Sequence, residues 1–594
     1  MCGICGIYNF NQKKISKNEL KIMNDQMISR GPDAEGYLLE NNFGMAMRRL
    51  SIIDIDKSNQ PISNESQNIS IIFNGEIYNF IEIRKQLLSD GVNFQTNGDT
   101  EVILKLYEKF GEKFISKLIG MFSICIFDKI KKKILIYRDR FGIKPLYYYY
   151  DKNSLYFASS LFSLKKVLKL KKSKDAFFLY LCLNYFPSKI SAYEDVNSLL
   201  PKEYIKIENN RLSIQKYEIE IHSYENFNQS KFKDIIDDSI NINLRSDVNL
   251  GLMMSSGLDS SIIAKQATKN IQDIKAYTAD FENKYDNESI LAKRFAEELK
   301  INHETIKVNE NDVPHHLNEI LRNMDEPCAD TAIIPSYLIS KKAKDDGIKV
   351  LLSGAGGDEI FGGYGRHYIN FYTFFYGILS FLKIKEHKLI NIFPYKIQNY
   401  LLKFLNKQFA YIANTSGQNL GIIFEIINKN DNKKLIDSLE RILLGLIKSN
   451  FGFNSQSIIN ADLSLYLPDN ILRPFDKVSM INSVEGRVPF LDHRLLDIIK
   501  SFNLDVTNRG SFTKNKKILR DLYNKDLPEY IMNNKKKGFN APLDKWKIRY
   551  EDHSSQEFFE DNLNMRLVSQ NLKNKNYTNF LYNLNTYKIW AEYN

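Results

Sequence analysis

The chain has 594 residues, which is too many for one hydrophobic core, so the sequence predicts at least two domains. With 43% hydrophobic and 26% charged residues, the composition is that of a soluble globular protein and excludes a disordered chain. The net charge of +11 comes from 82 basic and 71 acidic residues scattered along the chain, which indicates solubility and weak steering and not a nucleic-acid surface.

Apolar segments and cysteines predict a cytoplasmic location. The longest nearly apolar stretch, residues 371–382, is shorter than the roughly 20 residues that span a bilayer, and it predicts a buried or interfacial helix. No charged segment followed by an apolar one begins the chain, so no secretory signal is expected. The chain has five cysteines, and an odd number does not suit a framework of disulfides. Their spacing is not that of a zinc site either. Both observations fit a reducing compartment.

The first predicted element is a strand that follows Cys2, where glycines alternate with aliphatic residues. Removal of Met1 would give Cys2 a free α-amine with a pKa of about 8, so one residue would supply both a thiol nucleophile and a general base. That is the logic of N-terminal nucleophile hydrolases. Taken alone, a cysteine at position 2 is more simply explained as part of a strand.

Four motifs follow Cys2 and decide between these interpretations. They are Arg30-Gly31-Pro32-Asp33, Arg48-Arg49-Leu50-Ser51-Ile52-Ile53-Asp54, Phe73-Asn74-Gly75-Glu76-Ile77-Tyr78-Asn79 and Asn97-Gly98-Asp99-Thr100-Glu101. Singly they have simpler explanations, because Asn74-Gly75 is typical of a hairpin turn and Asp99 suits the cap of a helix over residues 100–110. In this order and spacing they resemble the glutaminase domain of class II glutamine amidotransferases, and specifically that of asparagine synthetases.

This resemblance implies an α+β domain with four αββα layers, in which Cys2 attacks the carboxamide of glutamine. The Asn74 side chain and the Gly75 N–H would hold the oxyanion. Arg49 would pair with the α-carboxylate of glutamine, and Asp99 and Glu76 would receive its α-ammonium. The implied glutamine-binding residues are Arg49, Leu50, Ser51, Ile52, Ile53, Asn74, Gly75, Glu76 and Asp99. Met47 is a departure, because the family usually has His there.

The end of this domain is predicted from turn and linker composition. Residues 134–150 predict two strands around a turn at residues 139–146. The domain is predicted to close just after residues 199–201, and a polar stretch at residues 218–230 suits a linker. The predicted domains are therefore residues 1–215, a glutaminase domain, and residues 216–594, a synthetase domain.

Two small-residue loops mark the second domain. A buried strand predicted at residues 249–254 leads into Ser255-Ser256-Gly257-Leu258-Asp259-Ser260-Ser261 and a helix, an arrangement that binds anions through backbone N–H groups and the helix dipole. The spacing is not that of a Walker loop. A serine-capped helix would explain the motif alone, but it resembles the pyrophosphate loop of ATP pyrophosphatases. A predicted strand at residues 349–352 leads into the second loop, Ser353-Gly354-Ala355-Gly356-Gly357-Asp358-Glu359.

Further segments match asparagine synthetases in order, so the resemblance covers most of the chain and implies an α/β PP-loop synthetase fold that uses ATP and Mg²⁺. These segments are residues 276–281, 325–330, 476–480, 485–492, 516–520, 536–539 and 542–546. The implied ATP-binding residues are Met254, Ser255, Gly257, Leu258, Asp259, Ser260, Ala279, Ser353, Gly354 and Lys516. Asp259 and Asp358 would supply carboxylates to Mg²⁺. No function is inferred for residues 371–459 or for the tail beyond residue 550.

Ala355 leaves the acceptor open, because the family generally has an acidic residue there and a methyl group can neither accept a proton nor bind a metal. The predicted function is a ligase that uses glutamine and ATP to amidate a carboxylate, forming AMP and PPi, with aspartate as the first acceptor to consider. The alternatives are another acceptor, such as a sugar uronic acid in surface polysaccharide biosynthesis, and a glutaminase-only or non-catalytic relative. A tRNA-modifying ATP pyrophosphatase would share the first loop, but the glutaminase motifs argue against it.

The expected partners are small molecules, namely glutamine, ATP and aspartate or another carboxylate. Neither a nucleic-acid partner nor a membrane span is expected. The sequence leaves open whether the chain forms a homodimer.

Overall fold

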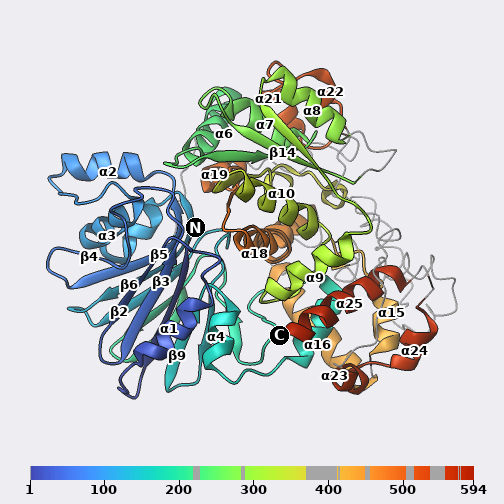
Figure 1. The fold of residues 1–594 in the computed structure, drawn as a ribbon, viewed down its shortest axis with the longest axis horizontal. Coiled ribbons are helices and arrows are strands. Elements are labelled where there is room, and N and C mark those ends of the chain that lie inside the picture. The colour runs from blue at the N-terminus through green and yellow to red at the C-terminus, as the bar shows by residue number, and fades with distance from the viewer. Residues whose placement is uncertain are drawn as a thin grey trace.

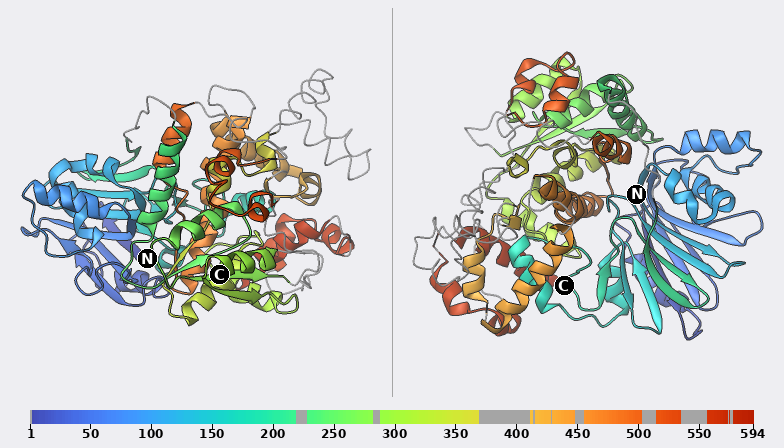
Figure 2. Two further views of the ribbon diagram at one scale, coloured as in Figure 1. Left: turned by 90° about the horizontal axis from the view of Figure 1, so that it is seen from above. Right: turned by 180° about the vertical axis from the view of Figure 1, so that it is seen from behind.

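The structure is a computed structural model, and the residues that it describes are 2–218, 228–281, 288–368, 411–412, 415–427, 429–447, 455–502, 514–534, 556–572, 574 and 577–594. Four predictions lie wholly or mostly outside these residues: the helix at residues 371–382, the linker at residues 218–230, and the matching segments 536–539 and 542–546. Figures 1 and 2 show two stacked antiparallel sheets on one side of the molecule and a smaller sheet wrapped by helices on the other.

Two six-stranded antiparallel sheets form the N-terminal half. The first has the strand order β10 (Val196–Ser198), β8 (Tyr147–Tyr150), β9 (Ser154–Ala158), β1 (Gly3–Asn9), β3 (Phe43–Arg49) and β2 (Ala34–Leu39). The second has the order β12 (Arg211–Lys216), β11 (Glu203–Glu208), β7 (Lys133–Arg138), β6 (Gly120–Asp128), β5 (Ile69–Ile77) and β4 (Ile62–Ser63). The predicted strand after Cys2 is confirmed by β1, and the strands predicted around the 139–146 turn by β7 and β8.

Side-chain alternation along β1 divides two apolar cores, because successive residues of a strand point to opposite faces. Ile4 is buried between the two sheets, whereas Cys5 and Ile7 are buried against α1 (Lys17–Asp25) and α4 (Leu161–Val167), which cover the outer face of the first sheet. On the other side, α2 (Phe80–Ser89) and α3 (Asp99–Phe110) cover the second sheet. The N-terminal half therefore has the predicted four-layer αββα architecture.

Met47 lies in the core between the two sheets. Its side chain is fully buried there, in the same cluster as Ile72 and Cys125 of the opposite sheet. A flexible thioether fills apolar space well, so methionine suits this core at the position where the family usually has histidine.

A five-stranded parallel sheet forms the centre of the C-terminal half. Its strand order is β15 (Asn302–Lys307), β14 (Lys275–Asp280), β13 (Leu250–Met253), β16 (Val350–Leu352) and β17 (Glu485–Arg487). The strands predicted at residues 249–254, 276–281 and 349–352 are confirmed by β13, β14 and β16, and the half has the predicted α/β fold. Because β13 lies between β14 and β16, the loops after β13 and β16 share the crevice at the carboxyl ends of these strands.

Helices pack around this sheet, and a further group of helices lies below it in the view of Figure 1. The described ones are α5 (Lys174–Leu183), α6 (Gln229–Asn243), α7 (Leu258–Ala267), α8 (Glu288–Glu298), α9 (Val313–Asn323), α10 (Ile333–Asp345), α11 (Gly357–Phe361), α15 (Leu420–Ile426), α16 (Lys429–Ile447), α17 (Ser455–Ala461), α18 (Arg473–Ile481), α19 (His493–Ser501), α21 (Lys517–Leu522), α22 (Glu529–Met532), α23 (Gln556–Asn562), α24 (Met565–Gln570) and α25 (Thr578–Tyr593). Shorter or wider turns form the 3₁₀-helices η1 (Gly111–Lys117) and η2 (Gly365–Tyr368) and the π-helix η4 (Asp462–Leu472).

The tail packs into the core through α25. Tyr587 and Trp590 of this helix are fully buried in a cluster that also contains Phe177 of α5, and the Trp590 indole donates a hydrogen bond to the Met324 carbonyl at 3.0 Å. No function was inferred for this tail from the sequence. Its last helix, α25, has a structural role, because it packs against both α5 of the N-terminal half and α9 of the C-terminal half.

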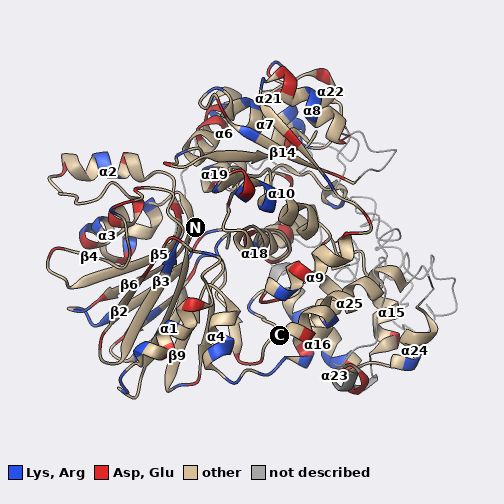
Figure 3. Cartoon of the chain, in the orientation of Figure 1, with Lys and Arg blue, Asp and Glu red and all other residues tan. Residues whose placement is uncertain are grey.

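Surface charge and apolar length bear on the expected partners. In the described part of the chain, no helix is both long and apolar enough to cross a membrane. Basic and acidic residues are interspersed along the helices and strands in the view of Figure 3.

Candidate active sites

Cys2 lies in the wall of a small pocket of the N-terminal half and is 6% exposed. The other lining residues are Arg49, Leu50, Ile52, Ile53, Ser58, Gln60, Phe73, Gly75, Glu76, Asp99 and Thr100. The structure thus gathers most of the predicted glutamine-binding residues around Cys2, whereas Ser51 and Asn74 lie beside the lining. Ser58 and Gln60 also belong to the pocket, but neither stands in a motif that marks it.

The Cys2 thiol needs a base to become a nucleophile. Burial raises its pKa, although a hydrogen bond from the Leu50 backbone and the charge of Arg49 oppose that rise. Because only the thiolate is strongly nucleophilic, a proton acceptor must lie beside the sulfur. The α-amine that removal of Met1 would expose is such a group on the same residue.

Asn74 holds the nitrogen of Cys2 in place. Its Oδ1 accepts a hydrogen bond from the Cys2 nitrogen at 3.1 Å, and its Nδ2 donates to the Ser159 hydroxyl at 3.3 Å. Ser159 also accepts from the Ile4 nitrogen at 3.1 Å, so it fixes both β1 and the Asn74 amide. The hairpin-turn interpretation of Asn74-Gly75 is wrong, because both residues lie inside β5.

Gly75 is needed for the close approach of β5 and β6. Its φ is 150°, and a Cβ atom there would lie 2.0 Å from the Met121 carbonyl oxygen. Any other residue would push the strand that carries Asn74 away from its neighbour.

Arg49 holds the loop that closes the pocket. Its Nη atoms donate to the carbonyl oxygens of Ile53, Asp54 and Ile55 at 3.0, 2.8 and 2.8 Å and to Asn59 Oδ1 at 2.9 Å. A guanidinium has five N–H donors, so four are used by the loop. Its pairing with the carboxylate of glutamine stays a prediction.

Asp99 and Glu76 place two buried carboxyl groups at the pocket. Asp99 is the first residue of α3, and its Oδ2 accepts from the Ile77 nitrogen at 3.0 Å, so it is not the helix cap; Gly98 takes that position. Burial raises the pKa of Asp99 to about 6. Burial and the charge of Asp99 raise the pKa of Glu76 well above its ordinary value. Both carboxyl groups are therefore harder to ionise than they would be in water.

Arg487 joins this carboxyl pair to the parallel sheet. It is fully buried on β17, with Nη2 at 3.2 Å from Glu76 Oε2, while its Nε donates to Glu485 Oε1 at 2.6 Å. Burial opposes ionisation of Glu485, but nearby positive charges, Arg487 among them, lower its pKa to about 2. Arg487 lowers the pKa of Glu76, but burial and the negative charges of Asp99 and Glu485 raise it by more. The Arg487 carbonyl also accepts from the Ser353 nitrogen at 2.8 Å, so this residue contacts both candidate sites.

We expect glutamine binding to weaken as the pH falls through about 6, where Asp99 becomes protonated. The ionised carboxylate would attract the α-ammonium of glutamine, and protonation removes that charge. The KM for glutamine, measured from about pH 8 to about pH 5, should therefore rise at the acid end. In the Asp99→Asn variant the KM should be high and nearly independent of pH. A wild-type KM that does not change over this range would contradict the role of Asp99.

The loops after β13 and β16 open into one cavity of about 530 Å³. The predicted ATP-binding residues in its lining are Met254, Ser255, Gly257, Leu258, Asp259, Ser260, Ser353, Gly354 and Lys516. Ala279 lies on the neighbouring strand β14, outside the lining. Two loops that are about a hundred residues apart in the sequence are thus brought to one site by the strand order.

Lys516 bridges two carboxylates in this cavity. Its Nζ contacts Asp259 and lies 2.6 Å from Asp358 Oδ1, and the side chain is 5% exposed. Burial would lower the pKa of Lys516, but the two carboxylates raise it above its ordinary value, so the ammonium stays charged. Its φ of 51° is a left-handed conformation that costs a non-glycine residue about 1–3 kcal/mol. The surrounding structure holds this strained conformation at the place where a phosphate-binding cation is predicted.

Small side chains let the loops close around the Lys516 cluster. A Cβ atom on Gly363 would lie 1.7 Å from Asp358 Oδ1 and 2.5 Å from Lys516 Cε, so any other residue there would displace the Asp358 and Lys516 side chains. Ser256, where the family more often has glycine, is accommodated because Asn534 Nδ2 donates to its hydroxyl at 2.8 Å and to its carbonyl at 3.1 Å.

Asp259 and Asp358 fit a magnesium site that substrate phosphates complete. Both carboxylates already converge on one cation, the Lys516 ammonium. Mg²⁺ is usually held by one or two carboxylates together with phosphate oxygens. Within the described ranges, no group of three or more Asp, Glu, His or Cys side chains is placed to hold a metal by itself, so a metal at this position would depend on the nucleotide.

Ala355 lines the same cavity, and the acids Glu359 and Asp330 lie in the lining with it. Glu359 is 1% exposed and accepts from the Tyr364 hydroxyl at 2.8 Å. Asp330 accepts from Asn470 Nδ2 at 2.8 Å, and burial raises the pKa of Asp330. Asn470 belongs to the π-helix η4, a conformation often found at functional sites. The cavity therefore contains carboxyl groups even though position 355 does not supply one.

Asp476 forms a second buried link between the two halves. Its carboxylate contacts Arg30 Nη1 at 2.8 Å and Lys144 Nζ at 3.2 Å, and Arg30 Nε donates to the Cys2 carbonyl at 3.2 Å. Burial would raise the pKa of Asp476, but the two cations lower it. The backbone of Cys2 is thus tied through Arg30 to α18 of the C-terminal half.

The N-terminal half has a pocket with a cysteine in a four-layer αββα fold, and the C-terminal half has a cavity lined by two glycine-rich loops in a parallel α/β fold. These two features define a class II glutamine amidotransferase joined to an ATP-using synthetase. Residues 1–218 match the family model of the glutamine amidotransferase domain, and residues 231–590 match that of asparagine synthase. The chain belongs to the family of glutamine-hydrolysing asparagine synthetases. It is therefore a ligase of the kind that uses ATP and carries out glutamine-dependent amidation.

Relatives support this assignment. Asparagine synthetase [glutamine-hydrolyzing] 1 of Bacillus subtilis (strain 168) is 32% identical over 92% of this chain and 88% of its own length. Putative asparagine synthetase [glutamine-hydrolyzing] 2 of Methanocaldococcus jannaschii is 34% identical over 66% of this chain and 81% of its own. Amidase chry2 of Gibberella zeae is 24% identical over 92% of this chain and 90% of its own.

Proposed function

We propose that the chain converts aspartate to asparagine with nitrogen from glutamine, and that it cleaves ATP to AMP and PPi in doing so. The observation that carries the proposal is the Asp259–Lys516–Asp358 cluster, which lies in the same cavity as Ala355 and the two glycine-rich loops. Residues 1–215 would be the glutaminase domain and residues 216–594 the synthetase domain. Arg487 supports the coupling of the two halves, because it contacts Glu76 with its side chain and Ser353 with its carbonyl.

In the first half-reaction, the Cys2 sulfur attacks the carboxamide carbon of glutamine while the α-amine of Cys2 takes the thiol proton. The Asn74 side chain and the Gly75 N–H hold the oxyanion, which preorganised donors stabilise most strongly. The α-amine of Cys2 returns the proton to the departing nitrogen, which leaves as ammonia. Water then hydrolyses the γ-glutamyl thioester to glutamate and restores the thiol. Asp99 holds the substrate through its α-ammonium.

In the second half-reaction, an oxygen of the acceptor carboxylate attacks the α-phosphorus of ATP, and PPi leaves. Lys516 neutralises charge on the departing PPi, and Asp259 and Asp358 would hold Mg²⁺. When bound, Mg²⁺ supplies further charge neutralisation to the phosphates. Ammonia attacks the acyl-adenylate carbon and displaces AMP, which leaves the amide.

A different carboxylate acceptor is the second candidate. It is favoured by Ala355, whose methyl group replaces the acidic side chain that asparagine synthetases generally carry in this loop. The name of the Gibberella zeae relative, an amidase, shows that similar chains are not all named for asparagine. A uronic acid in surface polysaccharide synthesis is one such acceptor.

PPi release across a panel of acceptors tests the proposal. The purified chain is given ATP, Mg²⁺ and glutamine with aspartate, with free uronic acids, or with their nucleotide sugars. We expect the fastest release with aspartate and a changed rate with aspartate in the Ala355→Glu variant. Fast release with a uronic acid alone would favour the second candidate. If glutamine is hydrolysed but no acceptor leads to PPi release, the chain is a glutaminase only.

A further inference from the structure

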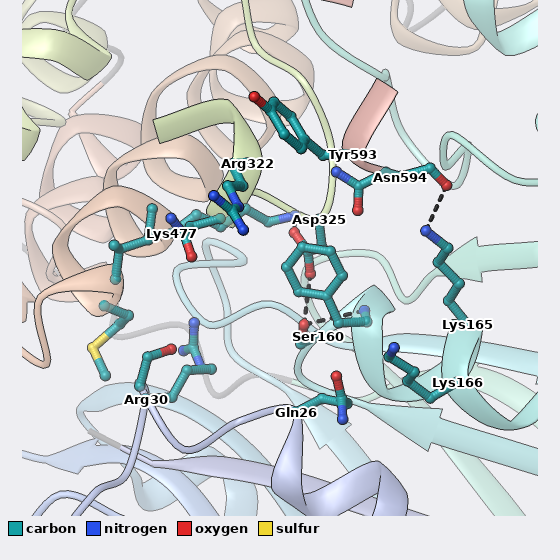
Figure 4. Close-up of a pocket in the computed structure, with 15 residues that line it drawn as sticks. Gln26, Arg30, Ser160, Lys165, Lys166, Arg322, Asp325, Lys477, Tyr593 and Asn594 are labelled. Atoms are coloured by element: carbon teal, nitrogen blue, oxygen red, sulfur yellow. Dashed lines mark hydrogen bonds and ion pairs between the residues drawn. The ribbon is translucent and has the colours of Figure 1, made fainter. Parts of the chain in front are cut away.

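A cleft of about 460 Å³ lies at the seam between the two halves and shares no lining residue with the glutamine pocket or the nucleotide cavity. Its walls come from the end of α1, from α4, α9 and α18, and from the end of α25. Figure 4 shows these side chains around the opening, with Arg30, Lys477 and Arg322 on one side and Lys165 and Lys166 on the other. The proposed reaction uses none of this space.

The lining is strongly basic, because it contains five cationic side chains and one acidic side chain, that of Asp325. Lys477 contacts Asp325 and lies 3.4 Å from Glu326, so its charge is already balanced. Among the described residues, Lys165, Lys166 and Arg322 form no ion pair with an acidic side chain. Lys165 Nζ donates to a main-chain oxygen of Asn594 at 2.5 Å, and burial and the charge of Lys166 lower the pKa of Lys165. Lys166 and Arg322 are thus the lining cations that are left for a ligand.

Arg30 adds a buried donor to this cleft. The residue is 6% exposed, and its Nη2 is buried without a hydrogen-bond partner, while its other nitrogens bind Asp476 and the Cys2 carbonyl. Buried polar groups are nearly always hydrogen-bonded, so a donor without a partner in the wall of a cleft points to a ligand.

We propose that this cleft binds a phosphate monoester of about the size of a nucleoside monophosphate. Arg30, Arg322 and Lys166 would surround the phosphate, since guanidinium and ammonium groups form its strongest hydrogen bonds. Tyr593 and Phe162 offer aromatic faces to the rest of the ligand, and the amides of Gln26 and Asn323 offer it hydrogen bonds. The volume lies within the range of small-molecule sites, about 300–1,000 Å³. The inference does not depend on which carboxylate the enzyme amidates.

Isothermal titration calorimetry on the full chain tests the proposal, with GMP and inorganic phosphate as probes. The double variant Lys166→Gln, Arg322→Ser removes two exposed cations of the cleft and is expected to fold, which a thermal melt checks. Lys169→Gln removes an exposed cation outside the lining and is the matched control. Lys516→Met reports binding to the nucleotide cavity instead.

GMP is expected to bind the wild type more tightly than inorganic phosphate does, because only GMP reaches the aromatic wall. The double variant should lose about tenfold or more in GMP affinity, while Lys169→Gln and Lys516→Met should keep it. Absence of GMP binding to the wild type would overturn the proposal. So would GMP binding that survives in the double variant and is lost in Lys516→Met.

Discussion

Replacing Cys2 with alanine should abolish glutamine-dependent PPi release and leave ammonium-dependent release close to the wild-type rate. The sulfur is the proposed nucleophile, and loss of a nucleophile costs at least about a thousandfold in rate. The nucleotide cavity shares no lining residue with the Cys2 pocket, so its chemistry should continue when ammonia is supplied directly. PPi release with glutamine and with ammonium chloride, measured on the same preparation, separates the two outcomes.

Cys5 provides a matched control for this experiment. It lies on the same strand but faces α1 and is fully buried outside the pocket, so Cys5→Ala should keep both activities. If Cys2→Ala lost both activities, Cys2 would have a structural role in place of the proposed chemical one. If it kept the glutamine-dependent activity, another group would be the nucleophile.

Replacing Lys516 with methionine should remove PPi release with either nitrogen donor while basal glutamine hydrolysis persists. The variant loses the cation that bridges Asp259 and Asp358 and would meet the pyrophosphate. Loss of one preorganised charge partner of a transition state costs about a hundredfold to a thousandfold. PPi release with ammonium and glutamate release without acceptor are the two measurements.

The neighbouring Lys517 gives the matched control. It is exposed and pairs with Asp521 on the surface of α21, so Lys517→Met should behave like the wild type. Equal losses in the two variants would show that the effect comes from α21 as a whole. An unchanged PPi rate in Lys516→Met would contradict the assignment of the pyrophosphate site.

The sequence predicted the features that local pattern determines. Short apolar runs next to glycine and serine predicted strands β1, β13 and β16 and the loops after them. The order of the motifs identified the family. The architecture could be predicted because a glutaminase domain and a parallel α/β sheet each follow from such ordered elements.

Contacts between the halves could not be predicted. Arg487 reaches Glu76 across 411 residues of sequence, and Arg30 reaches Asp476 across 446. No periodicity or spacing reports a pairing of that separation. The same holds for α25, whose buried Tyr587 and Trp590 show their place only once α5 and α9 are folded against them.

Local interpretation also fails where a side chain serves a distant partner. Asp99 precedes a helix and looks like its cap, but its carboxylate accepts from the Ile77 nitrogen in β5. Asn74-Gly75 resembles a turn, but it lies inside a strand, where the Asn74 amide forms hydrogen bonds with the Cys2 nitrogen and the Ser159 hydroxyl. In both cases the tertiary partner outweighs the local preference.

Transfer of the glutamine amide nitrogen tests the central claim most directly. The wild-type chain is incubated with aspartate, ATP, Mg²⁺ and glutamine that carries heavy nitrogen in its amide, and the products are measured by mass spectrometry. The account predicts asparagine that carries the heavy nitrogen, formed in equal amounts with AMP and PPi. Glutamate that accumulates without any labelled amide product, or labelled product formed without AMP, would contradict it.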